Sequence, residues 1–243
     1  IEDVTLKYGL VTVQGPNSRR IISRISGIDI KEMEECNHLN LTINKINCKV
    51  ARTTYTGEEG YNIYAPWDDI KSVFSSEIDP FGLAAYNSLR IEAGIPLYSI
   101  DMDEDTIPIE ANLDNAISYT KGCYIGQETI ARIKFKGHVN RILTGFSISF
   151  MPFGTEFNSV PETRALPENR IIPQKGDRIY TVADKNELNI GVITSACFSP
   201  TLNKSIAIGY LRTGSNEPGT QVLIESKPHK ISAVVTALPF YTN

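Results

Sequence analysis

Apolar residues in the first part of the chain recur at the spacings of strands and helices. Apolar positions between Leu10 and Val13 predict a strand, and Gly15-Pro16 predicts a turn. After Asn17, isoleucines recur at helical spacing as far as Gly27, a residue suited to end a helix (Ile21, Ile22 and Ile25). The first thirty residues therefore predict a strand followed by a helix.

The next segments predict a hairpin, a strand and two helices. Residues 39–43 and 46–50 alternate apolar with polar positions and change phase near Asn44-Lys45, which predicts a hairpin with Cys48 in the core. A strand is predicted over 61–64, and a helix that opens at Trp67-Asp68-Asp69. The apolar face of that helix contains Ile70, Val73, Phe74 and Ile78.

A further helix is predicted over 83–93, ending before Gly94, and it places Tyr86 and Arg90 on one face. The order of these elements predicts an α+β fold, in which an antiparallel sheet of ferredoxin-like or closely related type has its helices on one face. We expect this α+β region to span residues 1–140.

The second part of the chain has a different pattern. Residues 151–173 form a polar stretch with prolines and no period, which predicts a loop. Short apolar runs separated by Gly, Asn and Pro follow at 178–182, 190–195, 205–211, 221–225 and 231–238. Many short strands with hardly any helix predict a small β-barrel or sandwich, which we expect to span residues 141–243.

Composition narrows the class of protein. The 243 residues include 24 Lys and Arg against 28 Asp and Glu, a net charge of −4. The chain therefore lacks the basic excess that non-specific binding of nucleic acid needs. We find no apolar run long enough to span a membrane and no signal-peptide pattern, and we predict a soluble protein without a membrane role. Because the chain starts at Ile1 instead of Met, we expect that residues upstream are missing.

Metal and nucleotide sites are not predicted. Cys36 and His38 offer two ligands where a closed site needs about four, and a solvated loop explains them better. The acidic run from Asp101 departs from a calcium-binding loop, with Thr106 in place of Gly and Asn112 in place of Glu. Neither of the two segments bounded by glycines, 57–60 and 214–219, continues as a phosphate-binding loop.

Cys123 is the strongest chemical candidate in the chain. It lies between Gly122 and Gly126, two residues after Lys121 and just before a segment, 127–133, that we predict to be helical. A nearby ammonium and a helix N-terminus both favour a thiolate, so the position suits a reactive cysteine. The alternative is a small buried hydrophobe in a tight turn, because no His or second Cys lies nearby in sequence.

Six runs of residues resemble the aminomethyltransferase (glycine cleavage T-protein) superfamily over nearly the whole chain. They are 52–63 (RTTYTGEEGYNI), 90–98 (RIEAGIPLY), 101–104 (DMDE), 108–111 (PIEA), 121–128 (KGCYIGQE) and 239–241 (PFY). The fifth run is similar to the signature of the YgfZ-type folate-binding branch and its mitochondrial iron–sulfur assembly counterparts. Aminomethyltransferases usually have an acidic residue where Cys123 stands and Lys where Gln127 stands.

The resemblance implies a tetrahydrofolate pocket and a C-terminal barrel. Tyr55 matches an aromatic residue near the folate, and Arg90 matches an arginine that reaches it and suits a carboxylate tail. Asn62 stands where aminomethyltransferases usually carry a Glu that reads the pterin edge, and Asn115 where they often have an aromatic residue. An amide has one acceptor oxygen beside a donor face, so we expect weaker or altered pterin binding.

From the resemblance we expect a tetrahydrofolate-binding protein of the YgfZ type that assists iron–sulfur cluster assembly or repair. Cys123 would be its functional thiol, set in a motif that includes Lys121, Gly122, Gly126, Gln127 and Glu128. Its partners would be folate and iron–sulfur client or assembly proteins, in the bacterial cytoplasm or the mitochondrial matrix. Two alternatives stay open: an aminomethyltransferase, whose catalytic aspartate would precede this sequence, and a non-catalytic scaffold.

Overall fold

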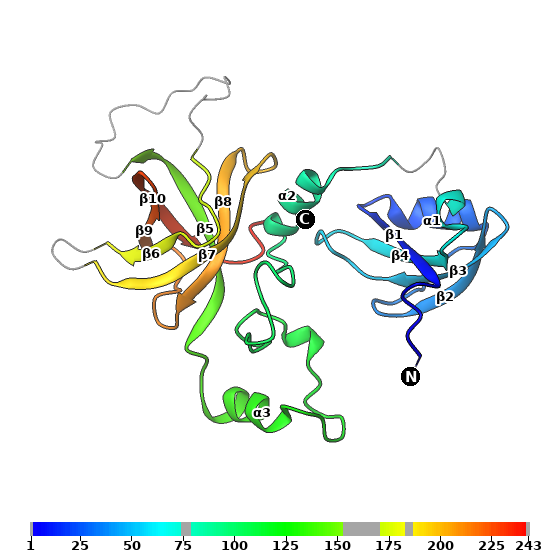
Figure 1. Cartoon of the computed structure of the whole chain (residues 1–243), viewed down its shortest axis with the longest axis horizontal. Coiled ribbons are helices and arrows are strands. Elements are labelled where there is room, and N and C mark those ends of the chain that lie inside the picture. Colours follow the sequence, from blue (N-terminus) through cyan, green and yellow to red (C-terminus); the bar gives the residue numbers. More distant parts are fainter. Residues whose placement is uncertain (1, 74–78, 153–170, 183–186, 242–243) are drawn as a thin grey trace. The chain divides into compact units, whose positions relative to one another are not determined.

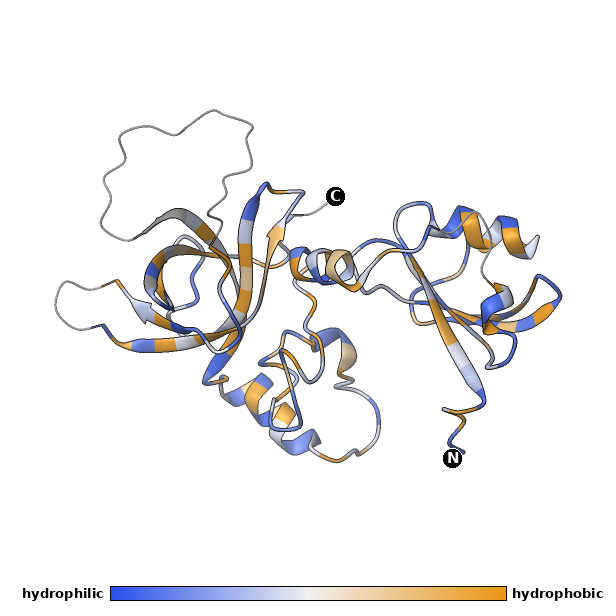
Figure 2. Cartoon of the chain, turned by 45° about the horizontal axis from the view of Figure 1, so that its top comes forward, coloured by the Kyte–Doolittle hydropathy of each residue, from blue (hydrophilic) through white to orange (hydrophobic). Residues whose placement is uncertain are grey.

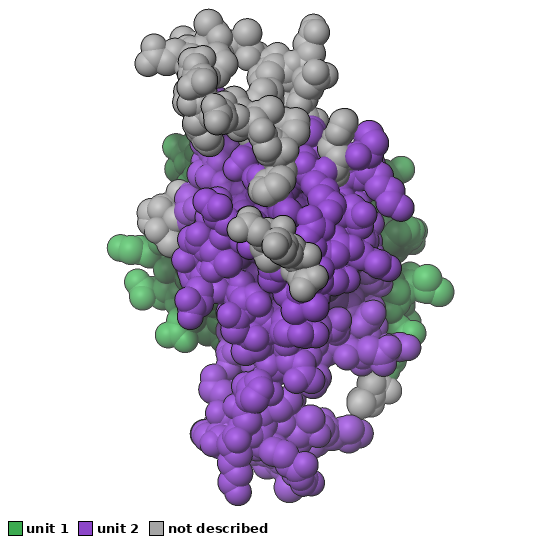
Figure 3. Space-filling model, turned by 90° about the vertical axis from the view of Figure 1, so that its left-hand side faces the viewer, with its two compact units in different colours: residues 1–90 green, residues 91–243 purple. Residues whose placement is uncertain are grey.

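The computed structural model describes residues 2–73, 79–152, 171–182 and 187–241 (Figure 1). The chain divides into two compact units, Ile1–Arg90 and Ile91–Asn243, which Figure 3 colours separately. A mixed fold with an antiparallel sheet and a closed barrel confirms the predicted fold class. The sequence predicted a boundary between an α+β region, residues 1–140, and a barrel region, residues 141–243. That boundary stays a prediction.

The first unit is built around a four-stranded antiparallel sheet. Its elements are β1 (Tyr8–Gln14), α1 (Ser18–Ser26), β2 (His38–Ile43), β3 (Ile46–Arg52), β4 (Gly60–Pro66), the 3-10 helix η1 (Ile70–Val73) and α2 (Leu83–Glu92), whose last two residues belong to the second unit. The strand order is β1-β4-β3-β2, with every neighbouring pair antiparallel. The predicted strands, hairpin and helix α1 are therefore confirmed.

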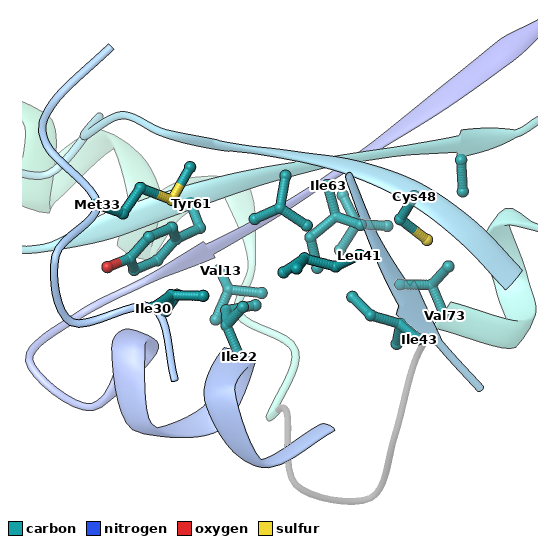
Figure 4. Close-up of a cluster of buried hydrophobic side chains, with 13 residues drawn as sticks. Val13, Ile22, Ile30, Met33, Leu41, Ile43, Cys48, Tyr61, Ile63 and Val73 are labelled. Atoms are coloured by element: carbon teal, nitrogen blue, oxygen red, sulfur yellow. The ribbon is translucent and has the colours of Figure 1, made fainter. Parts of the chain in front are cut away.

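One face of this sheet forms the core of the first unit. Alternate residues of each strand point to the same face and pack against α1 and η1, as Figure 4 shows for Val13, Leu41 and Ile63. Ile22 points from α1 toward the sheet in the same view. Cys48 is 3% exposed in this cluster, as its alternation predicted.

Two local features of this unit follow from the backbone. Asn44 and Lys45 both have positive φ angles, 49° and 68°, which is the geometry that a tight two-residue hairpin requires. The helix predicted from Trp67 is shorter in the described part of the chain, where only η1 forms, and Phe74 and Ile78 lie outside the described residues.

The second unit contains a six-stranded closed barrel in the order β10-β5-β8-β7-β6-β9. Its strands are β5 (Arg141–Pro152), β6 (Arg178–Thr181), β7 (Asn189–Ser199), β8 (Lys204–Arg212), β9 (Gln221–Ser226) and β10 (His229–Thr236), preceded by η2 (Asp114–Ala116) and α3 (Gln127–Lys136). Strand residues alternate between the barrel interior and the outside, which Figure 2 shows as alternating hydropathy. The five predicted strands are all present.

Strand β5 is the element that sequence reading missed. It pairs with β8 on one side and β10 on the other, so it closes the barrel. Met151 and Pro152, which we predicted to begin a loop, are the last residues of β5, and Pro152 opposes Ile231 at an irregular point of the ladder. A proline at a strand end fits this position because it removes no essential ladder bond. Residues 153–170 of the predicted loop lie outside the described part.

Buried carboxylates fasten the segment after α2 to the barrel. Asp101 accepts hydrogen bonds from the hydroxyls of Thr194 and Ser195, both at 2.6 Å, and from the Leu97 amide at 2.9 Å. Glu92 accepts hydrogen bonds from Ser199 at 2.5 Å and Thr201 at 3.1 Å. These bonds make Asp101 and Glu92 structural anchors.

Candidate functional site

A polar cluster lies on the face of the first sheet opposite its core. Asn62 is in the middle of β4 between two core residues, and strand alternation turns its side chain to this second face. Its amide nitrogen donates hydrogen bonds to the Tyr55 hydroxyl at 2.9 Å and the Tyr64 hydroxyl at 3.5 Å. The sheet thereby groups one amide with two phenols that are half-buried.

Gln14 holds the loop that carries Tyr55. The side-chain oxygen of Gln14, at the end of β1, accepts a hydrogen bond from the Tyr55 amide at 3.0 Å. Its nitrogen donates to the Thr12 hydroxyl at 2.7 Å and to the Thr53 carbonyl at 3.3 Å. A Cβ atom on the opposing Gly60 would come within 2.3 Å of the Gln14 amide, so a larger residue at position 60 would displace the Gln14 side chain from these bonds.

Asn62 has an acceptor without a partner. The residue is 3% exposed, and its side-chain oxygen makes no hydrogen bond with any described residue. An unpaired buried carbonyl oxygen costs about 1–3 kcal/mol, which a protein rarely accepts without a reason. A ligand with an N–H or O–H group at this face would remove that cost, so the residue has the chemistry of a binding group.

Helix α2 contributes an aromatic ring and a cation to the first unit. Burial raises the pKa of Tyr86, the positive charge of Arg90 opposes that rise, and Tyr55 adds to it, so the three side chains interact electrostatically. Arg90 is 1% exposed, and its Nε donates to the Asn87 side-chain oxygen at 2.9 Å. Fixed in this way, Arg90 is a preorganised cation, not a flexible surface group.

The Cys123 motif lies in the second unit, in the turn before α3. The Cys123 side chain is exposed. Gly126 has a φ of 88°, the left-handed conformation that favours glycine at the start of α3. The Gln127 amide donates to the Lys121 carbonyl at 3.4 Å, and the Lys121 ammonium lies 4.9 Å from the centre of the Tyr124 ring.

The contacts of the other predicted residues in this region are local to η2, the turn and α3. Glu128 pairs with Arg132 one helical turn later at 2.7 Å, on the exposed side of α3. Asn115, in η2, is exposed. The bonds of Gln127 and the geometry of Gly126 shape the turn that presents Cys123 to solvent.

Neither a metal cluster nor a spanning helix is found in the described part of the chain. Over 2–73, 79–152, 171–182 and 187–241, the structure has no group of three or more His, Cys, Asp or Glu side chains that could hold a metal ion. No helix within these ranges is long and apolar enough to cross a membrane. Cys36 is exposed beside β2, and the exposed His38 begins that strand.

Comparison with known proteins decides the family. The model of the GCVT N-terminal domain matches residues 1–121, and that of the glycine cleavage T-protein C-terminal barrel domain matches residues 164–242. The chain belongs to the aminomethyltransferase superfamily. The resemblance stated from sequence is confirmed at this level, and the YgfZ-type branch stays a prediction.

Relatives of known name agree with this assignment. The chain is 32% identical to an aminomethyltransferase of Halothermothrix orenii, covering 96% of this chain and 61% of the relative. It is 33% identical to a mitochondrial aminomethyltransferase of Solanum tuberosum, covering 95% of this chain and 53% of that protein. The crystal structure of glycine cleavage system aminomethyltransferase T from Bartonella henselae superposes with a TM-score of 0.74 and 26% identity, over 96% of this chain and 60% of that one.

The chain thus spans between half and two thirds of the length of these relatives.

The structure brings some of the predicted site residues together and leaves others apart. Of the site residues predicted from sequence, Tyr55 and Asn62 are hydrogen-bonded to each other. Arg90 and Tyr55 both influence the pKa of Tyr86, Arg90 by lowering it and Tyr55 by raising it. Asn115 and Cys123 belong to the second unit. Gln14 and Tyr64 were missed, although strand alternation from Asn62 and the opposing register with Gly60 could have found them.

Proposed function

We propose that this chain forms the folate-binding part of an aminomethyltransferase. The unpaired, buried side-chain oxygen of Asn62 carries the proposal, because tetrahydrofolate offers N–H donors along its pterin edge. Membership of the aminomethyltransferase superfamily and relatives consistently named aminomethyltransferase support it. When bound, tetrahydrofolate supplies the acceptor nitrogens for a one-carbon unit delivered as an aminomethyl group on a lipoyl carrier.

Residues of the first unit would hold the folate by complementary chemistry. Asn62 would accept a pterin N–H hydrogen bond, while its own amide nitrogen stays bound to the Tyr55 hydroxyl. Tyr55 would supply a ring face for the pterin, and Gln14 would keep that ring in place through its backbone. Arg90, held by Asn87, would attract a carboxylate of the folate tail.

The direct test measures turnover and binding together, with the full-length protein. Methylenetetrahydrofolate formation is followed from an aminomethyl-loaded lipoyl carrier protein, and tetrahydrofolate binding is measured by calorimetry. We expect both turnover and binding. Binding without turnover would contradict transferase activity and favour an accessory role, whereas failure of both would leave a non-catalytic scaffold.

One observation favours a second candidate, the YgfZ-type accessory role in iron–sulfur cluster assembly. Residues 121–128 carry the Cys-containing motif in place of the acidic residue and lysine usual in aminomethyltransferases, and the Cys123 thiol is exposed to solvent. An exposed thiol at a turn is accessible to a partner protein or to an oxidant. In this role folate binding would accompany client maturation, and iron–sulfur client or assembly proteins would be the partners.

The thiol can be tested against another exposed cysteine. Cys123→Ala is compared with Cys36→Ala, since both side chains are exposed. In the accessory role, Cys123→Ala abolishes complementation of a deletion strain in assays of iron–sulfur enzyme activity, while Cys36→Ala complements fully. Equal complementation by both variants would remove the thiol from the function and leave the transferase proposal standing alone.

A further inference from the structure

A charged groove runs along α1, on the side of the first unit away from Asn62. It has a volume of about 900 Å³, and Asn17, Arg20 and Arg24 line it from one side of the helix. At 100° per residue, Arg20 and Arg24 stand opposite Ile22, which points into the core. Asp29, Lys31 and Glu59 also line it.

The cations of this groove outnumber its carboxylates. Four basic side chains and two acidic ones line it, in a chain whose net charge is −4. Glu59 is already engaged, since its carboxylate receives Arg19 at 2.6 Å and the Tyr61 hydroxyl at 3.1 Å. Among the described residues, neither Arg20 nor Lys31 forms a side-chain ion pair, so positive charge is left facing the groove.

The start of α1 contradicts the usual electrostatics of helices. Its first turn contains no acidic residue, and the Asn17 side chain makes no capping hydrogen bond. Arg20 occupies the third helical position, where a capping box has Glu or Gln, and its charge is repelled by the positive end of the helix dipole. Where a natural protein departs from such local rules, the departure is expected at a functional or strained site.

We propose that this groove binds an acidic segment of a partner protein. The uncapped amides at the start of α1 and the Arg20 guanidinium would receive one carboxylate, and Lys31 would lie along the path of a second. A groove with a volume of about 900 Å³ is larger than a single small anion needs.

The test titrates the full-length protein with a fluorescent poly-glutamate peptide of about ten residues, at low and at physiological salt. Arg20→Glu is expected to weaken binding at least about tenfold by placing a like charge in the groove. The same substitution is expected to raise Tm by about 1–2 °C, because it places an acid at the positive end of α1. A gain in Tm with a loss of binding is a result that simple damage to the fold would not give.

Matched variants separate this site from general charge attraction. Arg212→Glu changes an exposed cation of β8 in the second unit by the same charge and is expected to bind the peptide within about twofold of wild type. Lys31→Gln is expected to weaken binding several-fold. Equal weakening by Arg212→Glu, or wild-type binding by Arg20→Glu, would overturn the proposal.

Inorganic phosphate is titrated in the same assay. The proposal predicts that phosphate competes only at the concentration at which sodium chloride of equal ionic strength does. Saturable competition below that level would overturn it in favour of a small-anion site. Tetrahydrofolate binding is measured on each variant and is expected to stay unchanged, because Asn62 and α1 lie on opposite faces of the sheet, so failure here is distinct from failure of the folate proposal.

Discussion

Buried polar side chains have opposite surroundings in the two units. In the second unit, Asp101 receives hydrogen bonds from two barrel hydroxyls and the Leu97 amide, and Glu92 receives bonds from Ser199 and Thr201. In the first unit, Asn62 is equally buried, yet its side-chain oxygen has no partner among the described residues. The two carboxylates make their hydrogen bonds within the fold, whereas the side-chain oxygen of Asn62 makes none with the described residues.

This contrast shows that burial alone does not identify a functional residue. A buried group whose bonds are all made contributes to stability, and removing it leaves its partners unpaired. A buried group with an unmade bond weakens the free protein and gains when a ligand arrives. The unmade bond together with its place in the polar cluster marks Asn62 as a candidate binding group. The buried hydroxyls of Thr56, Tyr124 and Tyr210 also lack partners among the described residues, so the variants below test the distinction.

The largest effect on stability is expected from Asp101→Ala. The substitution removes the buried acceptor that the Thr194 and Ser195 hydroxyls and the Leu97 amide share, and should lower the free energy of unfolding by about 3 kcal/mol. Urea unfolding followed by circular dichroism measures it. A loss below about 1 kcal/mol would show that Asp101 is not an anchor, and Asp105→Ala, at an exposed carboxylate in the same segment, is the control.

The next effect concerns ligand binding. Asn62→Leu removes the unpaired acceptor and should weaken tetrahydrofolate binding at least about tenfold, while unfolding free energy changes by less than about 1 kcal/mol. Asn40→Leu, an exposed amide on β2, serves as the matched control and should bind normally. Calorimetry and urea unfolding are run on both variants. Large destabilisation with unchanged binding would place Asn62 with the structural anchors.

A smaller effect on binding is expected from Gln14→Ala. Gln14 positions Tyr55 without being proposed to touch the ligand, so loosening the 53–55 loop should raise the dissociation constant about threefold to tenfold. The conservative Gln14→Glu variant keeps the acceptor for the Tyr55 amide and should retain more affinity. If both variants lose affinity equally, the acceptor is not what positions Tyr55.

The smallest effect at neutral pH is expected from Tyr210→Phe. Burial raises the pKa of Tyr210 from 10.0 to about 12, Arg141 opposes this, and Asp101 and Glu110 add to it. Its hydroxyl has no partner among the described residues, so removal should change stability at pH 7 by less than about 0.5 kcal/mol.

The same phenol predicts an alkaline dependence of stability. Because the folded-state pKa is raised, stability is complete below pH 10 and falls as the pH rises toward 12, where the unfolded chain loses this proton first. Unfolding measured across that window should show a smaller decline for Tyr210→Phe than for wild type. An identical decline in both proteins would assign the alkaline loss to other groups.

Much of the first unit was predictable from local pattern. The hairpin at Asn44-Lys45 and the end of α1 at Gly27 follow from the alternation of apolar residues and from turn chemistry. Strand β5 was not predicted, because a long strand in a barrel is defined by its neighbours β8 and β10, which lie far away in sequence. Of the helix predicted after Trp67, the described residues contain the short η1, and the remainder lies outside them.

The candidate site was predictable only as separate residues. Sequence alone determined the alternation that turns Asn62 away from the core and the motif that contains Cys123, because both depend on near neighbours in the chain. The tertiary structure decided that Gln14, from a distant strand, fixes Tyr55, that Asn62 keeps one oxygen unpaired, and that Asp101 has its bonds satisfied. Hydrogen-bond satisfaction depends on groups that meet only when the chain folds, and the order of residues does not record which of them will meet.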